Sequence, residues 1–428
     1  MTDSKLPPPA ASRRRDRRAL YDVPRHSRQG GGSATAFVLK ILAASLAVVL
    51  VSGFTVATAT VWNLSTAIKD NAIDITDPDD TTPPQIGSIT GSFNILVVGV
   101  DNDADQDAAF GARDATLNDV NILLHVSEDH TTATVVSLPR DLITAQPACT
   151  DTETGRTSSA QRNVALNTAF ARGGLSCVVS TVADLTDLEI DYAAQMSFNA
   201  VVQMTDAVGG VSVCVAEDIV DTDSGLNLKA GVQEISGQVA LSFLRTRHGV
   251  GDGSDLSRIS SQQVYMSALL RQLQSDETLT NFSRLYQLAN VAATNVRLST
   301  TLTSLDTMVS MAQSLSTVDL STMALVQYPG TTGNPAYPGK VMPSQDIADE
   351  LFAKIAADEP VTLAEDSLGS GAALDESVPT ETPVVPETPI ATETPVDGST
   401  PLPETTSAAI NGLTGQTAAQ QTCSVSSG

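Results

Sequence analysis

Five apolar runs along the chain predict buried strands. FNILVVGVD (93–101), VNILLHVS (120–127) and TATVVSLP (132–139) come first, followed by VSVCVA (211–216) and the segment 319–327. Runs of four to eight mostly apolar residues are typical of strands that are covered on both faces. The first run ends in Asp101, as expected where a buried strand reaches the edge of its sheet.

Between these runs, apolar residues recur with the three- and four-residue spacing of amphipathic helices. The segments with this spacing are 174–187, 198–208, 258–275, 280–293, 302–315 and 344–356. Gly209-Gly210 closes the second of them, as glycine commonly does after a helix. Strands interleaved with helices predict an α/β domain with a mixed central β-sheet flanked by helices, which we place at 91–358.

The N-terminal region predicts a membrane anchor. Residues 1–36 form a basic arm, and 37–62 is apolar, with no charge from Ile41 to Val61. About 20 apolar residues span the hydrocarbon core, and basic flanks stay on the cytoplasmic side. We therefore expect one transmembrane helix, a cytoplasmic N-terminus and an extracellular domain at the cell membrane. A cleaved signal peptide is the alternative, disfavoured by the long basic arm and the long apolar stretch.

Two polar stretches flank the expected domain. Residues 63–90 read as a stalk, and 359–428 contains a Pro/Thr/Glu-rich tract, SVPTETPVVPETPIATETPVDGSTPLPETT. Such composition buries too little apolar surface to fold. We expect 359–428 to be a disordered tail, although its last residues, LTGQTAAQQTCSVSSG, could fold back through Cys423.

Charge and cysteine content narrow the functional classes. The formal net charge is −25 and the pI about 4.3, which argues against nucleic-acid binding, since that needs many cationic contacts. All four cysteines follow the expected anchor and lack CxxC spacing, so disulfides are favoured over zinc. We expect Cys149–Cys177, tying a loop to the following helix, and Cys214–Cys423 as the remaining pair.

Charged residues at expected strand ends are the candidates for chemistry. Asp101 and Asp119 could hold Mg²⁺ or Mn²⁺, because hard cations bind carboxylates together with phosphate oxygens. Arginines grip phosphate bidentately; the candidates are Arg140, Arg245, Arg247 and Arg258. In the alternative, both aspartates are turn residues or ion-pair partners of those arginines.

The remaining candidates carry weaker signals. His125 lies within a strand and is expected to be a hydrogen-bonded core histidine, whereas His248 either lines the site or serves a turn. The glycine-rich stretch 249–255 reads as a mobile rim. No GxSxG elbow and no Walker loop occur, so nucleophilic serine catalysis and P-loop chemistry have no support.

Several motifs in order resemble one known family. NILVVGVD, LNDVNILLHVS, VVSLPRDL, ALNTAFARGG, DAVGGV, RTRH and DLSRISSQQ fall between about 92 and 275. Together they resemble the LytR-CpsA-Psr (LCP) family, in its actinobacterial branch. The resemblance implies an anchored enzyme that transfers a glycopolymer from a polyprenyl-pyrophosphate carrier to peptidoglycan. An apolar tunnel for the polyprenyl tail would then lie between the sheet and the helices 198–208 and 258–275.

By this resemblance, Asp101 and Asp119 would hold Mg²⁺, the four arginines would grip the pyrophosphate, and Gln262 would support the site. Two positions depart from the family pattern. Ala165 stands where a lysine is common, with Arg162 as the candidate substitute, and Ser261 stands where an arginine is common. A pyrophosphatase and a non-catalytic envelope regulator that binds polyprenyl phosphate remain as alternatives.

Overall fold

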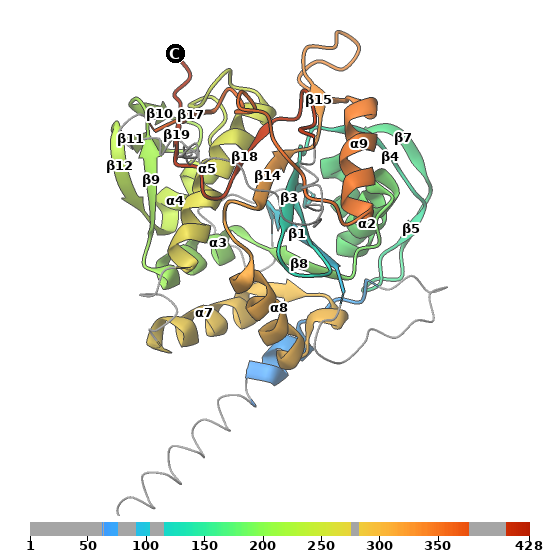
Figure 1. The fold of residues 1–428 in the computed structure, drawn as a ribbon. Helices are drawn as coiled ribbons and strands as arrows, with labels where there is room; N and C mark the ends of the chain where they lie inside the picture. Colours follow the sequence, from blue (N-terminus) through green and yellow to red (C-terminus); the bar gives the residue numbers. More distant parts are fainter. Residues whose placement is uncertain (1–61, 63, 76–90, 103–114, 275–281, 376–407) are drawn as a thin grey trace, which may run out of the picture. The chain divides into compact units, whose positions relative to one another are not determined.

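The computed structural model describes residues 62, 64–75, 91–102, 115–274, 282–375 and 408–428. A seven-stranded mixed sheet forms its centre, in the order β13-β8-β1-β2-β3-β14-β18 (Figure 1). These strands are β1 Phe93–Val100, β2 Asn118–Val126, β3 Ala133–Leu138, β8 Tyr192–Met196, β13 Val296–Leu298, β14 Met323–Gln327 and β18 Gly415–Thr417. The predicted mixed α/β architecture is confirmed.

The pairing directions bring several strand ends to one edge. β1 runs parallel to β8, β3 runs parallel to β14, and β2 is antiparallel to both β1 and β3. Consequently β1, β8, β3 and β14 all end where β2 begins, and we call this the carboxyl edge. Asp101, Asp119 and Arg140 therefore follow or open strands at the same edge, as the sequence predicted.

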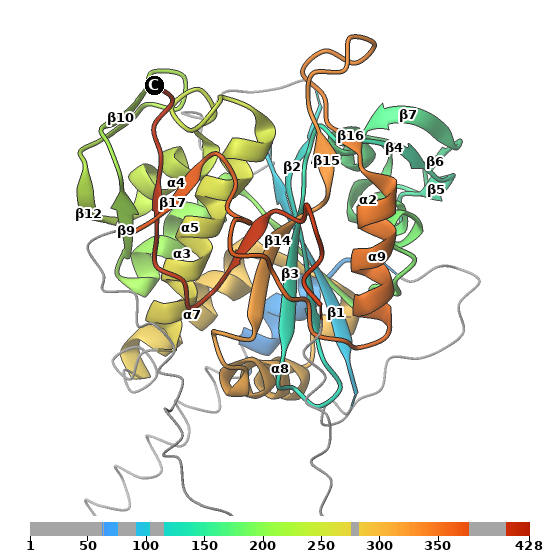
Figure 2. The same cartoon turned by 45° about the horizontal axis from the view of Figure 1, so that its top comes forward.

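The two faces of the sheet are packed differently (Figure 2). Helices α2 (Ala169–Thr186) and α9 (Gln345–Ala356) cover one face, against which Leu96 and Leu123 are fully buried. Helices α5 (Asp255–Leu273) and α8 (Leu305–Thr317) cover the other, where Val97, Ile122 and Leu124 stay only partly buried. The α2 face is therefore closed over the middle of the sheet, whereas the α5 face is looser.

A smaller sheet covers the outer side of α5. Its strand order is β12-β9-β19-β17, with β9 at Val211–Val215, β12 at Gly231–Ile235, β17 at Ala372–Leu374 and β19 at Thr422–Ser424. Val213 of β9, Phe243 of α4 (Gly237–Arg245) and Tyr265 of α5 form the core beneath it. Helix α5 is thus enclosed between two sheets, which fixes its position relative to the carboxyl edge.

The predicted helices and strands agree with the structure to within a few residues. Helix α3 (Phe198–Val208) matches at both ends, because Ser197 accepts a hydrogen bond from the Ala200 N–H and Gly209 takes a positive φ. Helix α4, the central strands β8, β13 and β18, and the short hairpins were not predicted. The remaining elements are β4 Ile143–Gln146, β5 Cys149–Thr150, β6 Thr157–Ser158, β7 Gln161–Ala165, η2 Leu166–Thr168, β10 Ile219–Asp221, β11 Leu226–Leu228, α7 Phe282–Asn295, η3 Thr300–Leu302, β15 Gly330–Thr331 and β16 Met342–Pro343.

The predicted stalk, 63–90, is wrong for residues 64–75. Residues 64–70 are helical, and Ile68 and Ile73 are each only 3% exposed. The Ile73 N–H donates to the Leu298 carbonyl at 2.8 Å, which attaches this segment to β13. Both isoleucines pack against the domain, although the residues around them in the sequence are mostly polar. The expected membrane span, 37–62, lies outside the described residues except for Trp62. Within the described ranges no helix is long and apolar enough to span a membrane.

The expectation of disorder throughout 359–428 is also wrong. Residues 361–375 and 408–428, which we call the C-terminal strap, add β18 to the central sheet and β17 and β19 to the smaller sheet. Ile410, Leu413 and Ala418 of the strap are buried. The prediction of disorder rested on the average composition of the tail, which is polar although these few residues are apolar. Most of the Pro/Thr/Glu tract, 376–407, lies outside the described residues.

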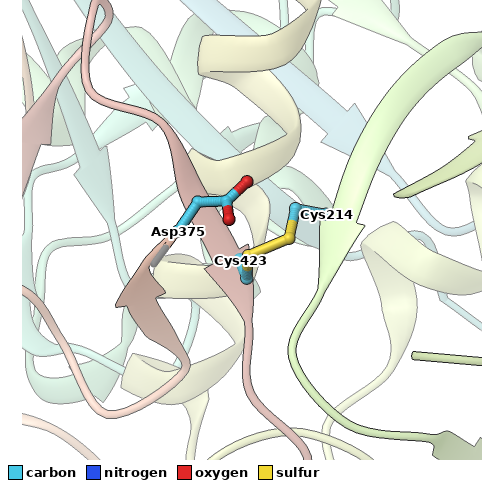
Figure 3. A group of neighbouring side chains, drawn as sticks. All are labelled: Cys214, Asp375 and Cys423. Carbon is cyan, nitrogen blue, oxygen red and sulfur yellow. A yellow bond between two sulfur atoms is a disulfide. The ribbon is translucent and has the colours of Figure 1, made fainter. Parts of the chain in front are cut away.

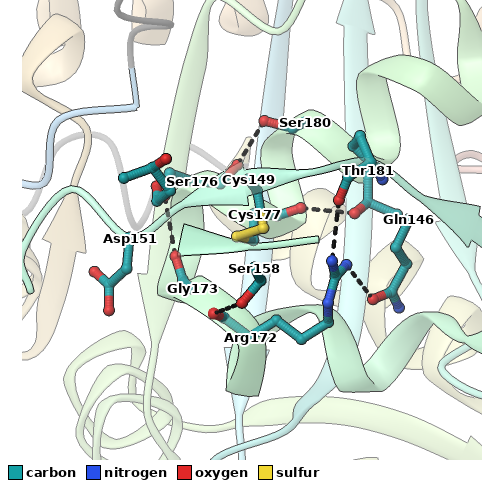
Figure 4. The surroundings of a disulfide bond; sticks show 12 residues. Gln146, Cys149, Asp151, Ser158, Arg172, Gly173, Ser176, Cys177, Ser180 and Thr181 are labelled. Carbon is teal, nitrogen blue, oxygen red and sulfur yellow. Dashed lines mark hydrogen bonds between the residues drawn. A yellow bond between two sulfur atoms is a disulfide. The ribbon is translucent and has the colours of Figure 1, made fainter. Parts of the chain in front are cut away.

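Both expected disulfides are present. Cys214–Cys423 joins β9 to β19 in the strap, beside Asp375 (Figure 3). Cys149–Cys177 joins β5 to α2 (Figure 4). Helix α2 is kinked at Gly173 and Gly174, and a Cβ at Gly173 would collide with the Cys177 sulfur. Glycine at 173 therefore lets the β5–β6 hairpin lie directly against the helix.

Candidate phosphate-binding site

An ion pair at the carboxyl edge joins two of the predicted residues. Asp119 lies at the start of β2, and Arg140 follows β3, the neighbouring strand. The Arg140 Nη1 donates to the Asp119 Oδ1 at 2.7 Å. Antiparallel pairing of β2 with β3 places the two residues at the same end of the sheet, so this contact follows from the register.

The first turn of α5 brings a second arginine to this pair. Ser254 caps the helix by accepting a hydrogen bond from the Ser257 N–H. Arg258 is 5% exposed; its Nη2 lies 2.6 Å from Asp255 Oδ1 and donates to the Asp119 carbonyl at 3.1 Å. Asp255 is the first helical residue and is buried, so the sequence interpretation of 249–255 as a mobile rim does not apply to it.

A third arginine, Arg247, forms an ion pair with Asp141, the residue after Arg140. The Arg247 Nη2 lies 3.3 Å from Asp141 Oδ2, and the Lys340 Nζ lies 2.7 Å from Asp141 Oδ1. Lys340 reaches this place because the Val341 N–H donates to the Asp141 carbonyl at 3.0 Å. Sequence reasoning missed Asp141 as a partner and missed Lys340 entirely, since a lone lysine in a Gly/Pro-rich loop belongs to no pattern. We call Arg140, Arg247 and Arg258 the arginine cluster.

The electrostatics of the cluster depend on its carboxylates. Burial lowers the pKa of Arg140, but the charges of Asp119 and Asp141 outweigh burial and raise this pKa overall. Burial lowers the pKa of Arg258, and the Arg140 charge lowers it further, while Asp255 opposes both. Three guanidinium groups are thus held together by aspartates that offset their mutual repulsion.

Each arginine of the cluster has one buried N–H group that makes no hydrogen bond to a described residue. The Nε atoms of Arg140, Arg247 and Arg258 are buried, and none of them has a hydrogen-bond partner among the described residues. Leaving a buried donor unsatisfied costs about 1–3 kcal/mol. Three such donors at one strand edge match an anion with several acceptor oxygens, and phosphate is the common case for arginine.

Asp101 completes the carboxyl edge. Its side chain is fully buried, and its Oδ1 accepts a hydrogen bond from the Leu117 N–H at 2.8 Å, which closes the loop between β1 and β2. Asp101 and Asp119 thus place carboxylates at the ends of adjacent strands. Carboxylate oxygens are donors that Mg²⁺ prefers, so the chemistry of these two residues is compatible with a divalent cation, which stays a prediction.

Arg245 lies against the start of α3, and Gln262 contacts the end of α4. Arg245 ends α4, and its guanidinium carbon lies 4.5 Å from the centre of the Phe198 ring, at the residue where α3 begins. The Gln262 Nε2 donates to the Leu244 carbonyl at 2.8 Å. Gln262 therefore contacts the backbone of the residue before Arg245, and its supporting role at the site stays a prediction.

The other two predicted residues lie elsewhere. Arg162 is exposed on β7 and makes no ion pair with any described residue. His248 is largely exposed, and its Nδ1 lies 2.9 Å from Asp223 Oδ2, beyond the β10 strand. The structure brings neither residue to the arginine cluster. His125, by contrast, is a buried strand histidine bonded to Asn94 and Asp358, as expected.

The model of the LytR_cpsA_psr family matches residues 55–355. The chain belongs to this family. It is 32% identical over 231 residues to the cell wall biosynthesis protein LcpA of Corynebacterium glutamicum, covering 48% of this chain and 44% of LcpA. It is 28% identical over 185 residues to the polyisoprenyl-teichoic acid–peptidoglycan teichoic acid transferase TagT of Bacillus subtilis, covering 42% and 52%. The chain thus matches about half the length of these relatives.

A solved structure of a protein from Streptococcus agalactiae shows the same fold. The superposition has a TM-score of 0.50 at 20% identity, and covers 63% of this chain and 88% of that one. The LytR_cpsA_psr match ends at 355, so the C-terminal strap follows the segment that defines the family.

The strap accounts for Ser261, one of the two positions that depart from the expected LytR_cpsA_psr motifs. Ser261 is 1% exposed, and its hydroxyl lies 2.8 Å from that of Ser424 in β19. An arginine at this position would occupy the space that β19 fills. At the other position, Ala165 pairs with Ile143 at the end of β7, and Lys340 rather than Arg162 adds a cation beside Asp141.

Ser261→Arg is therefore expected to lower the free energy of unfolding by about 3 kcal/mol or more, since overpacking costs about 1–3 kcal/mol and a buried unpaired charge adds to it. Urea unfolding followed by circular dichroism measures this. Ser261→Ala is the matched control, with an expected loss of about 1 kcal/mol for one hydrogen bond. Wild-type stability in Ser261→Arg would contradict this packing of the strap.

Proposed function

We propose that the protein is a phosphotransferase that attaches a glycopolymer from a polyprenyl-pyrophosphate carrier to peptidoglycan. The observation that carries this proposal is the arginine cluster beside the carboxylates of Asp101 and Asp119, with three buried Nε atoms that make no hydrogen bond to a described residue. The relative TagT is named as a transferase of polyisoprenyl-linked teichoic acid to peptidoglycan, and this supports the proposal.

In this proposal the arginine cluster binds the pyrophosphate and neutralises charge that develops during transfer. Phosphoryl transfer needs little covalent help from the protein, and positioning with electrostatic stabilisation supplies most of the catalysis. An acceptor hydroxyl bonds to the phosphorus that carries the glycopolymer, and the pyrophosphate bond breaks to release polyprenyl phosphate. Arg140, Arg247, Arg258 and Lys340 pair with Asp119, Asp141 and Asp255. Asp101 adds a fourth carboxylate, so the formal charges of the site balance, and a bound divalent cation would supply the positive charge that favours the anion.

Asp101 and Asp119 would hold Mg²⁺ or Mn²⁺. Such an ion would offset the negative charge of the phosphate groups. The hydrogen bond from Arg140 is made to the Oδ1 of Asp119, so the second carboxylate oxygen of Asp119 is compatible with a further ligand. We expect EDTA to stop transfer, and added Mg²⁺ or Mn²⁺ to restore it.

The α5 face of the sheet would bind the polyprenyl tail. Val97, Ile122 and Leu124 of the sheet are only partly buried there, as are Met266 and Leu270 of α5. Apolar side chains that remain partly accessible between a sheet and a helix suit an apolar ligand. The tunnel expected between the sheet and the helices 198–208 and 258–275 stays a prediction.

The location proposed is the outer side of the cell membrane, with 37–62 as a single-pass anchor and the N-terminus in the cytoplasm. The basic arm and the uncharged stretch of the sequence support this orientation. Two disulfides in the domain suit an oxidising exterior.

Replacing Arg247 by alanine is expected to lower the transfer rate about 100- to 1000-fold. In other enzymes, removing one hydrogen-bond donor that stabilises transition-state charge has an effect of this size. Arg247→Lys should recover part of it, since lysine keeps the charge but not the planar fork. The assay incubates the full chain in detergent with lipid-linked glycopolymer and peptidoglycan glycan chains, and quantifies the conjugate. Lys229→Gln, which removes an exposed cation paired with Asp218, is the control.

Two results would overturn the proposal. Wild-type protein that releases phosphate-capped glycan and forms no conjugate would be a pyrophosphatase. Alanine variants of Arg140 and Arg247 that retain full activity in a deletion strain would instead identify a non-catalytic protein that binds polyprenyl phosphate.

A further inference from the structure

A second polar pocket lies on the α2 face of the sheet. Its volume is about 380 Å³, within the usual range for small-ligand sites. The polar side chains that line it include Asn102, Asp151, Glu153, Arg156, Gln195 and Arg297. None of them belongs to the arginine cluster, and we call this cavity the hairpin pocket because the β5–β6 hairpin supplies one wall.

That wall is held in place by several bonds (Figure 4). The disulfide Cys149–Cys177 ties the hairpin to α2. Arg172 of α2 donates to the Gln146 Oε1 at 2.7 Å and to the Ser159 carbonyl at 2.6 Å, on either side of the hairpin. The pocket is therefore preformed, which lowers the entropic cost of binding.

One buried group in the hairpin pocket lacks a partner. Gln195 is 5% exposed, and its Oε1 accepts no hydrogen bond from any described residue. Gln195 of β8 is paired in register with Arg297 of β13, so both side chains stand on one face of the sheet. A buried amide oxygen without a donor is costly, and a ligand hydroxyl would satisfy it.

The charges in the pocket suit a neutral, hydroxyl-rich ligand. Asp151 and Glu153 offer acceptors, while Arg156 and Arg297 offer donors, and their formal charges balance. Arg297 already pairs with Glu153, and Arg156 donates to the Ala171 carbonyl at 2.8 Å. A phosphate would gain little net attraction from this lining. A sugar presents both donors and acceptors and matches this lining.

The position of the pocket relates it to the proposed reaction. Asn102 of the pocket directly follows Asp101, and the Leu117 N–H binds the Asp101 carboxylate. Arg258 comes from α5, on the opposite face of the same sheet. In phosphoryl transfer, the attacking and leaving oxygens lie roughly in line on opposite sides of phosphorus. An acceptor that enters from the α2 face would meet that requirement.

We propose that the hairpin pocket binds a sugar unit of the acceptor glycan and directs its hydroxyl to the phosphate at the arginine cluster. This inference rests on the proposed transferase function. It assigns the acceptor to the α2 face and the donor lipid to the α5 face.

The test varies the pocket and measures each substrate separately. In the full chain in detergent, Gln195→Leu and Arg156→Gln are expected to raise the KM for uncrosslinked peptidoglycan glycan oligomers at least tenfold. The KM for the lipid-linked donor should stay within twofold. Arg156 is exposed, so Arg156→Gln keeps the test valid if the buried Gln195→Leu variant fails to fold. Lys229→Gln serves as the control with unchanged constants.

Binding of the same glycan oligomers without donor, measured by calorimetry, separates the two proposals. Wild-type binding that is lost in Arg156→Gln supports the hairpin pocket even if no transfer occurs, and absence of transfer would then count against the proposed function alone. Wild-type protein that transfers, with both variants keeping the wild-type acceptor KM, overturns the assignment of the pocket. Equal binding of the glycan by wild type and both variants also overturns it.

Discussion

Arg258→Ala is expected to lower the rate of glycopolymer transfer at least about 100-fold, as for loss of one preorganised donor, and also to destabilise the fold. Arg258 is 5% exposed and contacts Asp255, which is 2% exposed, and the carbonyl of Asp119. Removing one partner of a buried ion pair costs about 3–5 kcal/mol, because the other charge is left in a low-dielectric interior. Urea unfolding and the conjugation assay measure the two effects.

A double variant separates the structural from the chemical role of Arg258. Arg258→Met with Asp255→Asn removes both buried charges while keeping similar volumes, so it should recover most of the stability. It should not recover transfer, since methionine offers no donor to phosphate. Recovery of both stability and transfer would show that Arg258 supports the fold only.

Deleting residues 408–428 is expected to abolish most of the stability of the domain. The deletion removes β18 from the central sheet, β19 from the smaller sheet and the Cys214–Cys423 disulfide. A disulfide contributes about 2–4 kcal/mol, and each fully buried apolar side chain about 1.5–3 kcal/mol. Ile410 and Leu413 are among those lost. The sum is comparable to the whole stability of a typical domain, about 5–15 kcal/mol.

The double variant Cys214→Ser with Cys423→Ser is the matched control. It removes the cross-link but keeps the strap, so its loss should be only about 2–4 kcal/mol. Thermal unfolding under non-reducing conditions compares the two. Equal stability of the truncated and full chains would show that the strap is not part of the core.

The strap also stabilises α5 and hence the arginine cluster. Ser257 of α5 contacts the Ser370 hydroxyl at 2.7 Å, and the Gln416 Nε2 donates to the Ser267 hydroxyl at 3.0 Å. A Cβ at Gly371 would collide with the Ser257 carbonyl. The serines of α5 allow this close approach, which a stripe of larger apolar residues would prevent.

The sequence by itself determined four strands of the central sheet, β1, β2, β3 and β14, and most of the helices. Continuous apolar runs and helical spacing are local properties of the chain, so they locate β1, β2, β3 and α3 without tertiary information. Charged residues at strand ends then indicated Asp119 and Arg140, since strand register alone brings them together.

Tertiary structure alone decided the remaining features. Lys340 joins Asp141 through a bridge between distant loops, and His248 points to Asp223 although it follows Arg247 directly. The strap folds because a few of its residues are apolar and because Cys423 bonds to Cys214, about 200 residues earlier. The polar average composition of 359–428 gives no sign of these contacts. The hairpin pocket likewise arises from β5, α2, β8 and β13. Such contacts depend on which segments meet in space, and local sequence patterns do not encode that.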